Sequence, residues 1–591
     1  MIIILEKVIN KRNTMKMNFQ HTLAIVILLV GVQCTVAQKK DDAIGTEVVN
    51  VVKPYTPTIS DAFKVKETPS FDDEDTNKKE AIQYSIFSFP VASTFTPSKG
   101  KAAGVDKSAA EKLYGNYATL AAGNYGTVNA ELFITENVSN KDYFGVMLRH
   151  LSSQGGIKSA LLENKYYNTS LDATYGSKSR KLSWNADLGY QNQIYNWYGL
   201  QPDTFDQITI DAISPKQTYH NFYLGGRVAV GESVFKEATV KFSHFWDAFS
   251  SGENRFLFQP QLEADIMGEK LKASFVLDYL SGNFQKQYFD FDGYKYGYTN
   301  VGFQPSYKIK QDDLTVNLGA GLFYSVSNEA NKNKFYIYPQ INATYKFVGD
   351  LMIGYAGAEG SLKQNTYHDF VDANFFVSPT LGITPTDQKY DLYIGLKGKL
   401  ANAIGYNIKG SYSDEANKAL FKSNEYNAQN TNLSGYAYGN SFGVVYDNVK
   451  TISFYGELKA DLSKDVAFGL NGTFSSYSMG TEAQAWNLPA MKLATTLDFK
   501  ITPKWEAGSS VFFVGQRKDQ AINSSLLVNT IQDVNLASYL DVNAHLNYKR
   551  NERLSFFLKG NNLANQKYQR WMNYPVQGIQ ILLGANYKFD F

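Results

Sequence analysis

Apolar and polar residues alternate along most of the chain, a pattern that predicts β-strands with two different faces. The last fourteen residues, Gly578 to Phe591, show it most clearly. Their apolar face consists of Ile579, Ile581, Leu583, Ala585, Tyr587, Phe589 and Phe591. Apart from Leu582, the other face is polar or small. Such a strand is longer than most strands of soluble proteins, and it suits a tilted strand that crosses about 25–30 Å of hydrocarbon.

The same alternation recurs from Asn116 to the C-terminus, in segments joined alternately by short turns and long loops. Short turns are expected near 139–141, 231–232, 349–350 and 551–552, and long loops near 191–219, 361–387 and 562–577. Bacterial membrane barrels have short periplasmic turns and long extracellular loops. The segments therefore predict an all-β fold, a transmembrane antiparallel β-barrel of about 22 strands, with both termini in the periplasm.

The composition agrees with a barrel. The 591 residues are 44% hydrophobic and 15% aromatic, yet the mean hydropathy is −0.31, and the only long apolar run is Leu23 to Val32. In a barrel, apolar residues that face lipid alternate with polar residues, so the mean hydropathy stays low. A helical membrane protein instead shows several runs of about 18 or more apolar residues. The alternative is a large soluble β-sandwich. The net charge of +2 argues against a nucleic-acid partner.

The N-terminus has the features of a secretory signal peptide. Lys11, Arg12 and Lys16 precede the apolar run, which is followed by small residues up to Ala37. Residues 1–37 are therefore expected to be removed. The only cysteine, Cys34, lies within this segment, so the mature chain is expected to contain no disulfide.

Residues 38–114 differ in character from the barrel. They contain a valine-rich strip, the proline-bearing sequence Lys53 to Pro57 and a charged run from Asp72 to Glu80. Charge and proline at this density favour an extended segment over a packed domain. We expect a periplasmic N-terminal segment over 38–114 and the barrel over 115–591.

Several motifs in the barrel region resemble those of TonB-dependent outer-membrane receptors. Leu558 to Tyr568 (LKGNNLANQKY) is similar to the signature of that family's penultimate strand, and Tyr574 to Gly578 is similar to the turn before its last strand. Thr384 to Lys397 resembles a strand in the middle of its barrel. The resemblance covers about residues 115–591 and is most specific in the last forty. It implies an outer-membrane barrel that takes part in the uptake of a nutrient or other solute.

The resemblance also implies partners. Members of the family carry a plug domain that is considerably longer than residues 38–114, so a truncated or absent plug is expected here. Glu47, Val48, Val49, Val51 and Val52 resemble the TonB box, which can add as a strand to the sheet of TonB. The alternative is a valine-rich linker.

The aromatic end of the chain, Tyr587, Phe589 and Phe591, resembles the signal that the barrel-assembly machinery recognises. Outer-membrane lipid and a surface lipoprotein are the other expected partners.

One long loop is a candidate ligand site. Residues 284–298 are rich in tyrosine and phenylalanine, and the candidate contacts are Tyr288, Asp290, Asp292, Tyr294 and Tyr296. Aromatic rings at a barrel mouth can stack on sugar rings, and two carboxylates can contribute to a Ca²⁺ site. The alternatives are an aromatic girdle and a hydrophobic cluster between loops.

Enzymatic activity is not expected. The histidines are scattered without metal-ligand spacing, and the chain has no phosphate loop and no Gly-x-Ser-x-Gly motif. No cofactor is predicted. We expect solute uptake across the bacterial outer membrane, and the alternative is a plugless, non-transporting barrel that serves as a scaffold subunit of an assembly or secretion complex.

Overall fold

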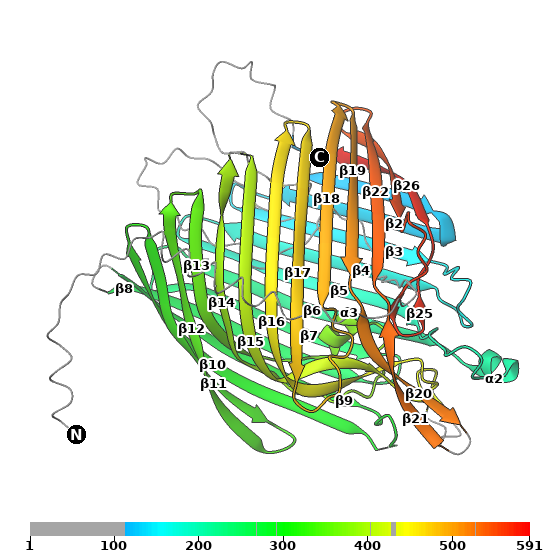
Figure 1. The fold of residues 1–591 in the computed structure, drawn as a ribbon. Coiled ribbons are helices and arrows are strands. Elements are labelled where there is room, and N and C mark those ends of the chain that lie inside the picture. Colours follow the sequence, from blue (N-terminus) through cyan, green and yellow to red (C-terminus); the bar gives the residue numbers. More distant parts are fainter. Residues whose placement is uncertain (1–112, 267–268, 291, 402, 427–432, 526–527) are drawn as a thin grey trace, which may run out of the picture. The chain divides into compact units, whose positions relative to one another are not determined.

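The computed structural model describes residues 113–591, except 267–268, 291, 402, 427–432 and 526–527. The predicted signal peptide and the segment 38–112, with its TonB-box-like strip, lie outside the described residues. The expectation of a truncated or absent plug concerns the same segment and stays a prediction. The described part is a barrel and the loops that belong to it (Figure 1).

Twenty-two strands form one sheet. They are β1 (Asn116–Gly123), β2 (Thr127–Asn137), β3 (Asp142–Ser153), β4 (Tyr166–Lys178), β5 (Leu182–Asn196), β6 (Lys216–Val230), β7 (Phe235–Asp247), β8 (Gly252–Ile266), β9 (Glu269–Phe284), β10 (Tyr294–Gln311), β11 (Leu314–Ser327), β12 (Lys332–Val348), β13 (Met352–Lys363), β14 (Thr386–Ala401), β15 (Ile404–Ser423), β16 (Phe442–Ser463), β17 (Val466–Met479), β18 (Met491–Thr502), β19 (Trp505–Val514), β22 (Tyr539–Lys549), β23 (Leu554–Asn561) and β26 (Gln580–Phe589).

Antiparallel pairing closes this sheet into a barrel. Each barrel strand pairs with the next along the chain, and β1 pairs with β26, with Ala118 opposite Tyr587 and Thr119 opposite Asn586. The predicted fold class and the predicted number of strands are confirmed. Closure removes the two free edges that an open sheet of this size would expose.

The two ends of the barrel differ in the length of their connections. At one end, the turn end, five connections are only two residues long, those after β8, β10, β14, β16 and β18. At the other end, the loop end, the longest loops are 197–215, 364–385, 424–441, 515–538 and 562–579. The loop end points downward in Figure 1, and the C-terminus lies at the turn end. β1 also begins at the turn end.

The outer face of the barrel is a belt of exposed apolar side chains. Leu148, Leu171, Leu188 and Leu224 on four successive strands are 42–52% exposed, and on β26 Leu583 is 64% exposed. Their sequence neighbours point inward, as Leu582 does at 4% exposure. An exposed apolar belt on alternating positions is the surface that a barrel presents to lipid.

The loops carry the remaining secondary structure. These elements are η3 (Asn124–Gly126), α2 (Gln207–Ala212), α3 (Tyr367–Ala373), and the hairpins β20 (Arg517–Ser525) with β21 (Val528–Leu536) and β24 (Gln569–Trp571) with β25 (Tyr574–Pro575). In the part of the chain that the structure describes, no helix has the length and apolarity needed to cross a membrane.

Candidate functional site

A large cluster of buried apolar side chains, which we call the aromatic cap, occupies the loop end of the barrel. Its members come from the loop ends of strands and from the long loops. They are Tyr195, Trp197, Tyr219, Phe245, Leu280, Phe284, Tyr296, Tyr367, Phe370, Val371, Phe375, Phe376, Val377, Leu381, Ile383, Tyr436, Ala437, Phe442, Leu536, Trp571, Met572 and Tyr574. These residues join strands of the β5–β10 wall to β16 and to the last loop, so the cap spans the loop end.

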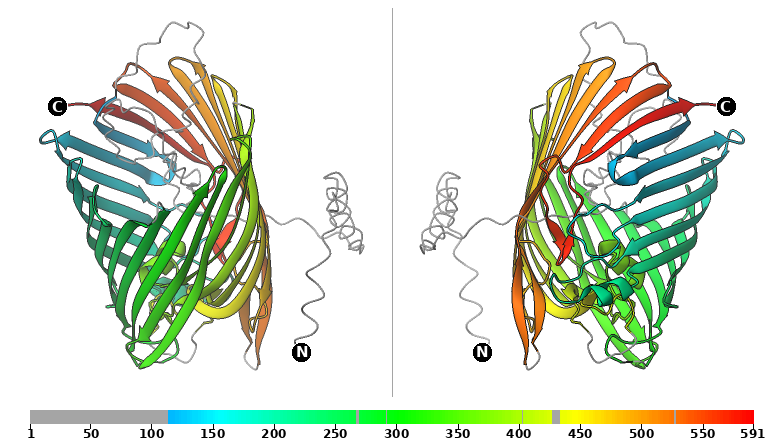
Figure 2. Two further views of the ribbon diagram at one scale, coloured as in Figure 1. Left: turned by 90° about the vertical axis from the view of Figure 1, so that its left-hand side faces the viewer. Right: turned by 90° about the vertical axis from the view of Figure 1, so that its right-hand side faces the viewer.

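The segment 364–385, between β13 and β14, supplies the centre of the cap. Its helix α3 lies inside the barrel wall (Figures 1 and 2). Thr366 caps the helix by accepting a hydrogen bond from Asp369 N at 2.9 Å. Glu253 of β8 accepts from Tyr367 N at 2.7 Å and from His368 N at 3.2 Å. A carboxylate at a helix N-terminus satisfies otherwise free amides, so Glu253 anchors this segment to the wall.

Tyrosines of the β5–β7 wall hold the same segment from another side. The Tyr219 hydroxyl donates to Phe375 O at 3.0 Å, and Tyr195 stacks on the Phe375 ring with centroids 4.0 Å apart. The Tyr367 hydroxyl donates to Asp247 at 2.8 Å. Buried phenols that are hydrogen-bonded in this way combine apolar packing with satisfied polar groups.

The last loop, 562–579, closes the cap from the C-terminal side. Tyr574 stacks on Phe376 with centroids 3.7 Å apart, and its hydroxyl donates to Asn440 O in loop 424–441. The Tyr198 hydroxyl donates to Pro575 O at 2.9 Å. Four loops that are far apart in the sequence therefore meet at the Phe376–Tyr574 ring pair.

Glycine permits the closest approach between loops. A Cβ atom at Gly435 would lie 1.8 Å from Ser214 O, a backbone atom of another loop. No side chain fits at that position without a shift of one loop.

The phenols of the cap stay protonated. Burial raises the pKa of Tyr436 to about 12, and it raises the pKa of Tyr574 well above the ordinary value. Desolvation disfavours the charged phenolate, so both hydroxyls remain hydrogen-bond donors over the physiological pH range.

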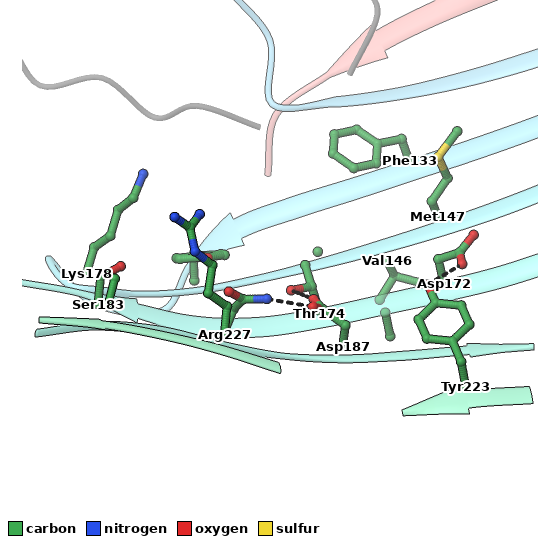
Figure 3. A pocket seen from close by; sticks show the side chains of 15 residues that line it. Phe133, Val146, Met147, Asp172, Thr174, Lys178, Ser183, Asp187, Tyr223 and Arg227 are labelled. Carbon is green, nitrogen blue, oxygen red and sulfur yellow. Dashed lines mark hydrogen bonds between the residues drawn. The ribbon is translucent and has the colours of Figure 1, made fainter. Parts of the chain in front are cut away.

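A polar cavity of about 650 Å³ lies on the inner wall of β2–β6, toward the turn end (Figure 3). Asp172 accepts from the Tyr223 hydroxyl at 2.7 Å and pairs with Arg149 at 3.0 Å. Asp187 accepts from Thr174 at 2.7 Å and from Asn185 at 2.6 Å. The carboxylates are thus satisfied by the wall itself, and the cavity is a water-compatible part of the lumen lining.

In the predicted ligand loop, the tyrosines contact the cap and the two aspartates face solvent. Tyr296 belongs to the cap, and its hydroxyl donates to Glu253 at 2.8 Å. Tyr288 and Tyr294 pack against the cap, and the Tyr288 hydroxyl donates to Glu425 O at 2.8 Å. Asp290 and Asp292 are exposed, and Asp290 accepts from the amide of Asp292 at 3.2 Å.

The three tyrosines therefore take the alternative role, a cluster between loops, and a ligand role of this loop stays a prediction. Within the described residues, no group of three or more histidine, cysteine, aspartate or glutamate side chains could hold a metal ion.

The predicted C-terminal signal lies at the end of β26, with Tyr587 and Phe589 on the strand and Phe591 two residues beyond it. Tyr587 is 44% and Phe591 81% exposed, and the Tyr587 and Phe589 rings stack with centroids 6.0 Å apart. Their recognition by an assembly machinery stays a prediction. The TonB contact also stays a prediction, because its residues lie outside the described part of the chain: Glu47, Val48, Val49, Val51 and Val52.

Sequence reasoning missed the cap. The alternation pattern predicts only a long loop over 361–387. The signal was the apolar content of the segment itself, because Phe370, Val371, Phe375, Phe376 and Val377 are unusual in a solvent-exposed loop.

Solved structures with the same barrel fold are outer-membrane receptors and transporters. The FrpB iron transporter of Neisseria meningitidis (F3-3 variant) matches 81% of this chain and 82% of its own, at 10% identity and a TM-score of 0.62. The ferric-catecholate import receptor Fiu of Escherichia coli K12 matches 80% and 82%, at 10% identity and a TM-score of 0.59. The ferripyoverdine receptor of Pseudomonas aeruginosa matches 80% and 72%, at 11% identity and a TM-score of 0.58.

No protein-family model and no curated protein matches the chain. At about one identical residue in ten, the structural likeness shows a shared fold.

Proposed function

We propose that this chain is a barrel of the bacterial outer membrane that takes part in the uptake of a solute, and that the aromatic cap is its extracellular gate. The observation that carries the proposal is a closed 22-strand barrel whose long loops fold together across one end. Barrels of this size enclose a lumen wide enough for solutes larger than single ions. A pore of that width needs a closure, and the cap provides one.

The exposed apolar belt supports a membrane location, and the turn end is the periplasmic end in this proposal. β1 begins at the turn end and β26 ends there, so both ends of the described chain lie at this end. The likeness to iron and siderophore receptors supports uptake as the class of function, while the identity of the solute is left open.

TonB is the partner that this arrangement implies. More than sixty residues separate the strip Glu47–Val52 from β1. A segment of that length allows the strip to reach a periplasmic protein. An extended β-branched strip can pair with a sheet edge through main-chain hydrogen bonds. Proline at position 49 removes one donor and blocks that pairing.

Energised uptake tests the proposal. Cells that express the parent chain or Val49→Pro are grown with a mixture of extracellular solutes, and the depletion of each solute is followed with and without a protonophore. We expect at least one solute to be depleted by the parent only in energised cells, and Val49→Pro to abolish this depletion. Val49→Ile is the matched control, because isoleucine keeps the donor and the strand preference.

Co-purification separates uptake from the scaffold alternative. Isolation of the barrel with TonB supports uptake. A stable set of envelope proteins, together with equal solute depletion in cells with and without the barrel, contradicts it.

A further inference from the structure

Three cationic side chains gather around Tyr539 on the inner side of the loop end. Lys492 of β18 is opposite Val514 of β19, and Val514 is opposite Tyr539 of β22. Directly opposed residues point to the same face of a sheet. The outward neighbour Leu540 is 37% exposed whereas Tyr539 is 4% exposed, so this row faces the lumen.

Two guanidinium groups complete the cluster. The Arg517 guanidinium lies 5.8 Å from the centre of the Tyr539 ring, and it donates to Arg570 O and, at 2.9 Å, to Gln569 O. It thereby holds the short hairpin that carries Arg570. Lys492 lies within electrostatic range of both arginines.

The positive charges exceed the negative charges near them. Asp519 and Asp541 are the neighbouring carboxylates, and each has hydrogen bonds of its own. Asp519 accepts from Ser423 N at 3.0 Å and from the Asn487 amide at 2.9 Å, and Asp541 accepts from the Tyr568 hydroxyl. The three cations outnumber these two carboxylates.

Asp519 attracts Arg517 electrostatically, but the hydrogen bonds of the Arg517 guanidinium go to backbone carbonyls. Arg517 is only 5% exposed, and its Nε has no hydrogen-bond partner within the described residues. The main electrostatic influences on Lys492 are the two arginines, and Arg517 likewise acts on Arg570. Burial, together with the charge of Arg517, lowers the pKa of the Arg570 guanidinium. A protein holds buried like charges together at a cost, and a bound anion removes that cost.

We propose that Lys492, Arg517 and Arg570 form an anion-binding site on the lumenal side of the aromatic cap, which takes carboxylate or phosphate groups. Planar guanidinium groups bind such groups in a bidentate way, and the Lys492 ammonium adds a mobile point charge. The Lys492 side chain is exposed to the lumen, so a ligand can reach it.

Two sources can supply this chemistry. One is an anionic solute in transit, which rests on the proposed uptake function. The other is the chain's own acidic run Asp72, Asp73, Glu74 and Asp75, which ends about 38 residues before Leu113. A linker of that length spans at most about 125–135 Å when extended. The β18 strand is only about 40 Å long, so the run can reach the site.

Calorimetric titration of the purified full chain in detergent at low ionic strength tests the site. The probes are inorganic phosphate and succinate. Lys492→Gln and Arg570→Gln are each expected to weaken binding at least tenfold. Lys500→Gln is the matched control, because Lys500 is on the same face of the same strand, about 26 Å nearer the turn end. Heat-modifiability gels establish that each variant is folded.

A second chain distinguishes the two sources. It carries Asp72→Asn, Asp73→Asn, Glu74→Gln and Asp75→Asn. Binding of a probe by the parent indicates a site open to solutes. Binding by the neutralised chain alone, with sensitivity to Arg570→Gln, indicates that the acidic run occupies the site. The proposal is overturned if neither chain binds either probe, or if Lys500→Gln weakens binding as much as Arg570→Gln does. If Val49→Pro leaves solute depletion unchanged, the uptake proposal fails, whereas the titration still tests the anion site, so the two proposals fail separately.

Discussion

The cohesion of the aromatic cap should decide whether the barrel conducts. Phe376 is 8% exposed, stacks on Tyr574 at 3.7 Å and meets Tyr198 edge-on at 5.7 Å. Replacement of such a buried phenylalanine by alanine removes about 3–5 kcal/mol. If opening breaks these contacts, Phe376→Ala raises the open population about one-hundredfold to a few thousandfold, since each 1.4 kcal/mol is about a factor of ten.

Single-channel recording in planar bilayers measures that population directly. The parent is expected to be nearly silent, and Phe376→Ala should show frequent openings. Phe474→Ala is the matched control, because Phe474 is 47% exposed on the outer face of β17 and takes no part in the cap. A parent chain without Gln38–Glu80 should also stay silent, since the cap alone spans the loop end.

Deletion of the central segment of the cap should give the largest increase in conductance. Lys363 and Thr386 are directly paired across β13 and β14, so residues 364–385 can be replaced by an Asn-Gly turn that restores a hairpin. This removes eight of the twenty-two cap residues and should give a persistently conducting barrel. If the deleted barrel remains silent, the cap is not the barrier. If it conducts while Phe376→Ala matches the parent, the contacts of Phe376 do not hold the gate.

Three further outcomes follow from the same geometry. Leu583→Arg places a charge on the lipid face at a cost of about 2–4 kcal/mol and should impair heat-modifiable assembly, whereas Asn586→Arg, on the lumen face, should assemble. Gly435→Ala should make the loops more sensitive to protease, because its Cβ meets Ser214 O, whereas Gly410→Ala, which meets nothing within 4 Å, should not. Burial raises the pKa of Asp519 from 3.8 to about 6, so its contribution to stability is fully present below about pH 3.8 and is lost as the pH rises through 6. The melting temperature should fall over that window, and Asp519→Asn should remove this part of the pH dependence.

Much of the barrel could be predicted because each strand is specified by the alternation of neighbouring residues. Alternation in β26 places Leu583 outside and Leu582 inside, and a side-chain period of two leaves no other choice once one face meets lipid. The order of short turns and long loops then gave the number of strands. Some connections at the loop end, such as 248–251 between β7 and β8, are as short as those at the turn end, so length alone does not distinguish the two ends everywhere.

The cap could not be predicted in the same way. Tyr198, Phe376 and Tyr574 lie in three different loops, and their ring contacts depend on barrel closure, which brings the first and last strands together. The five residues of the predicted ligand loop show the same limit. Their composition suits sugar stacking and packing equally, and only the tertiary structure shows that the three tyrosines pack in or against the cap.

The sequence by itself therefore determined the fold class, the strand number and the face of each strand, because a period-two pattern against lipid is a property of neighbouring residues. Only the tertiary structure decided what happens inside the barrel. It brought Lys492, Arg517 and Arg570 into one cluster and folded residues 364–385 into the loop end. Side chains from loops hundreds of residues apart meet there because a closed barrel fixes where each loop begins and ends, and no local pattern encodes that meeting.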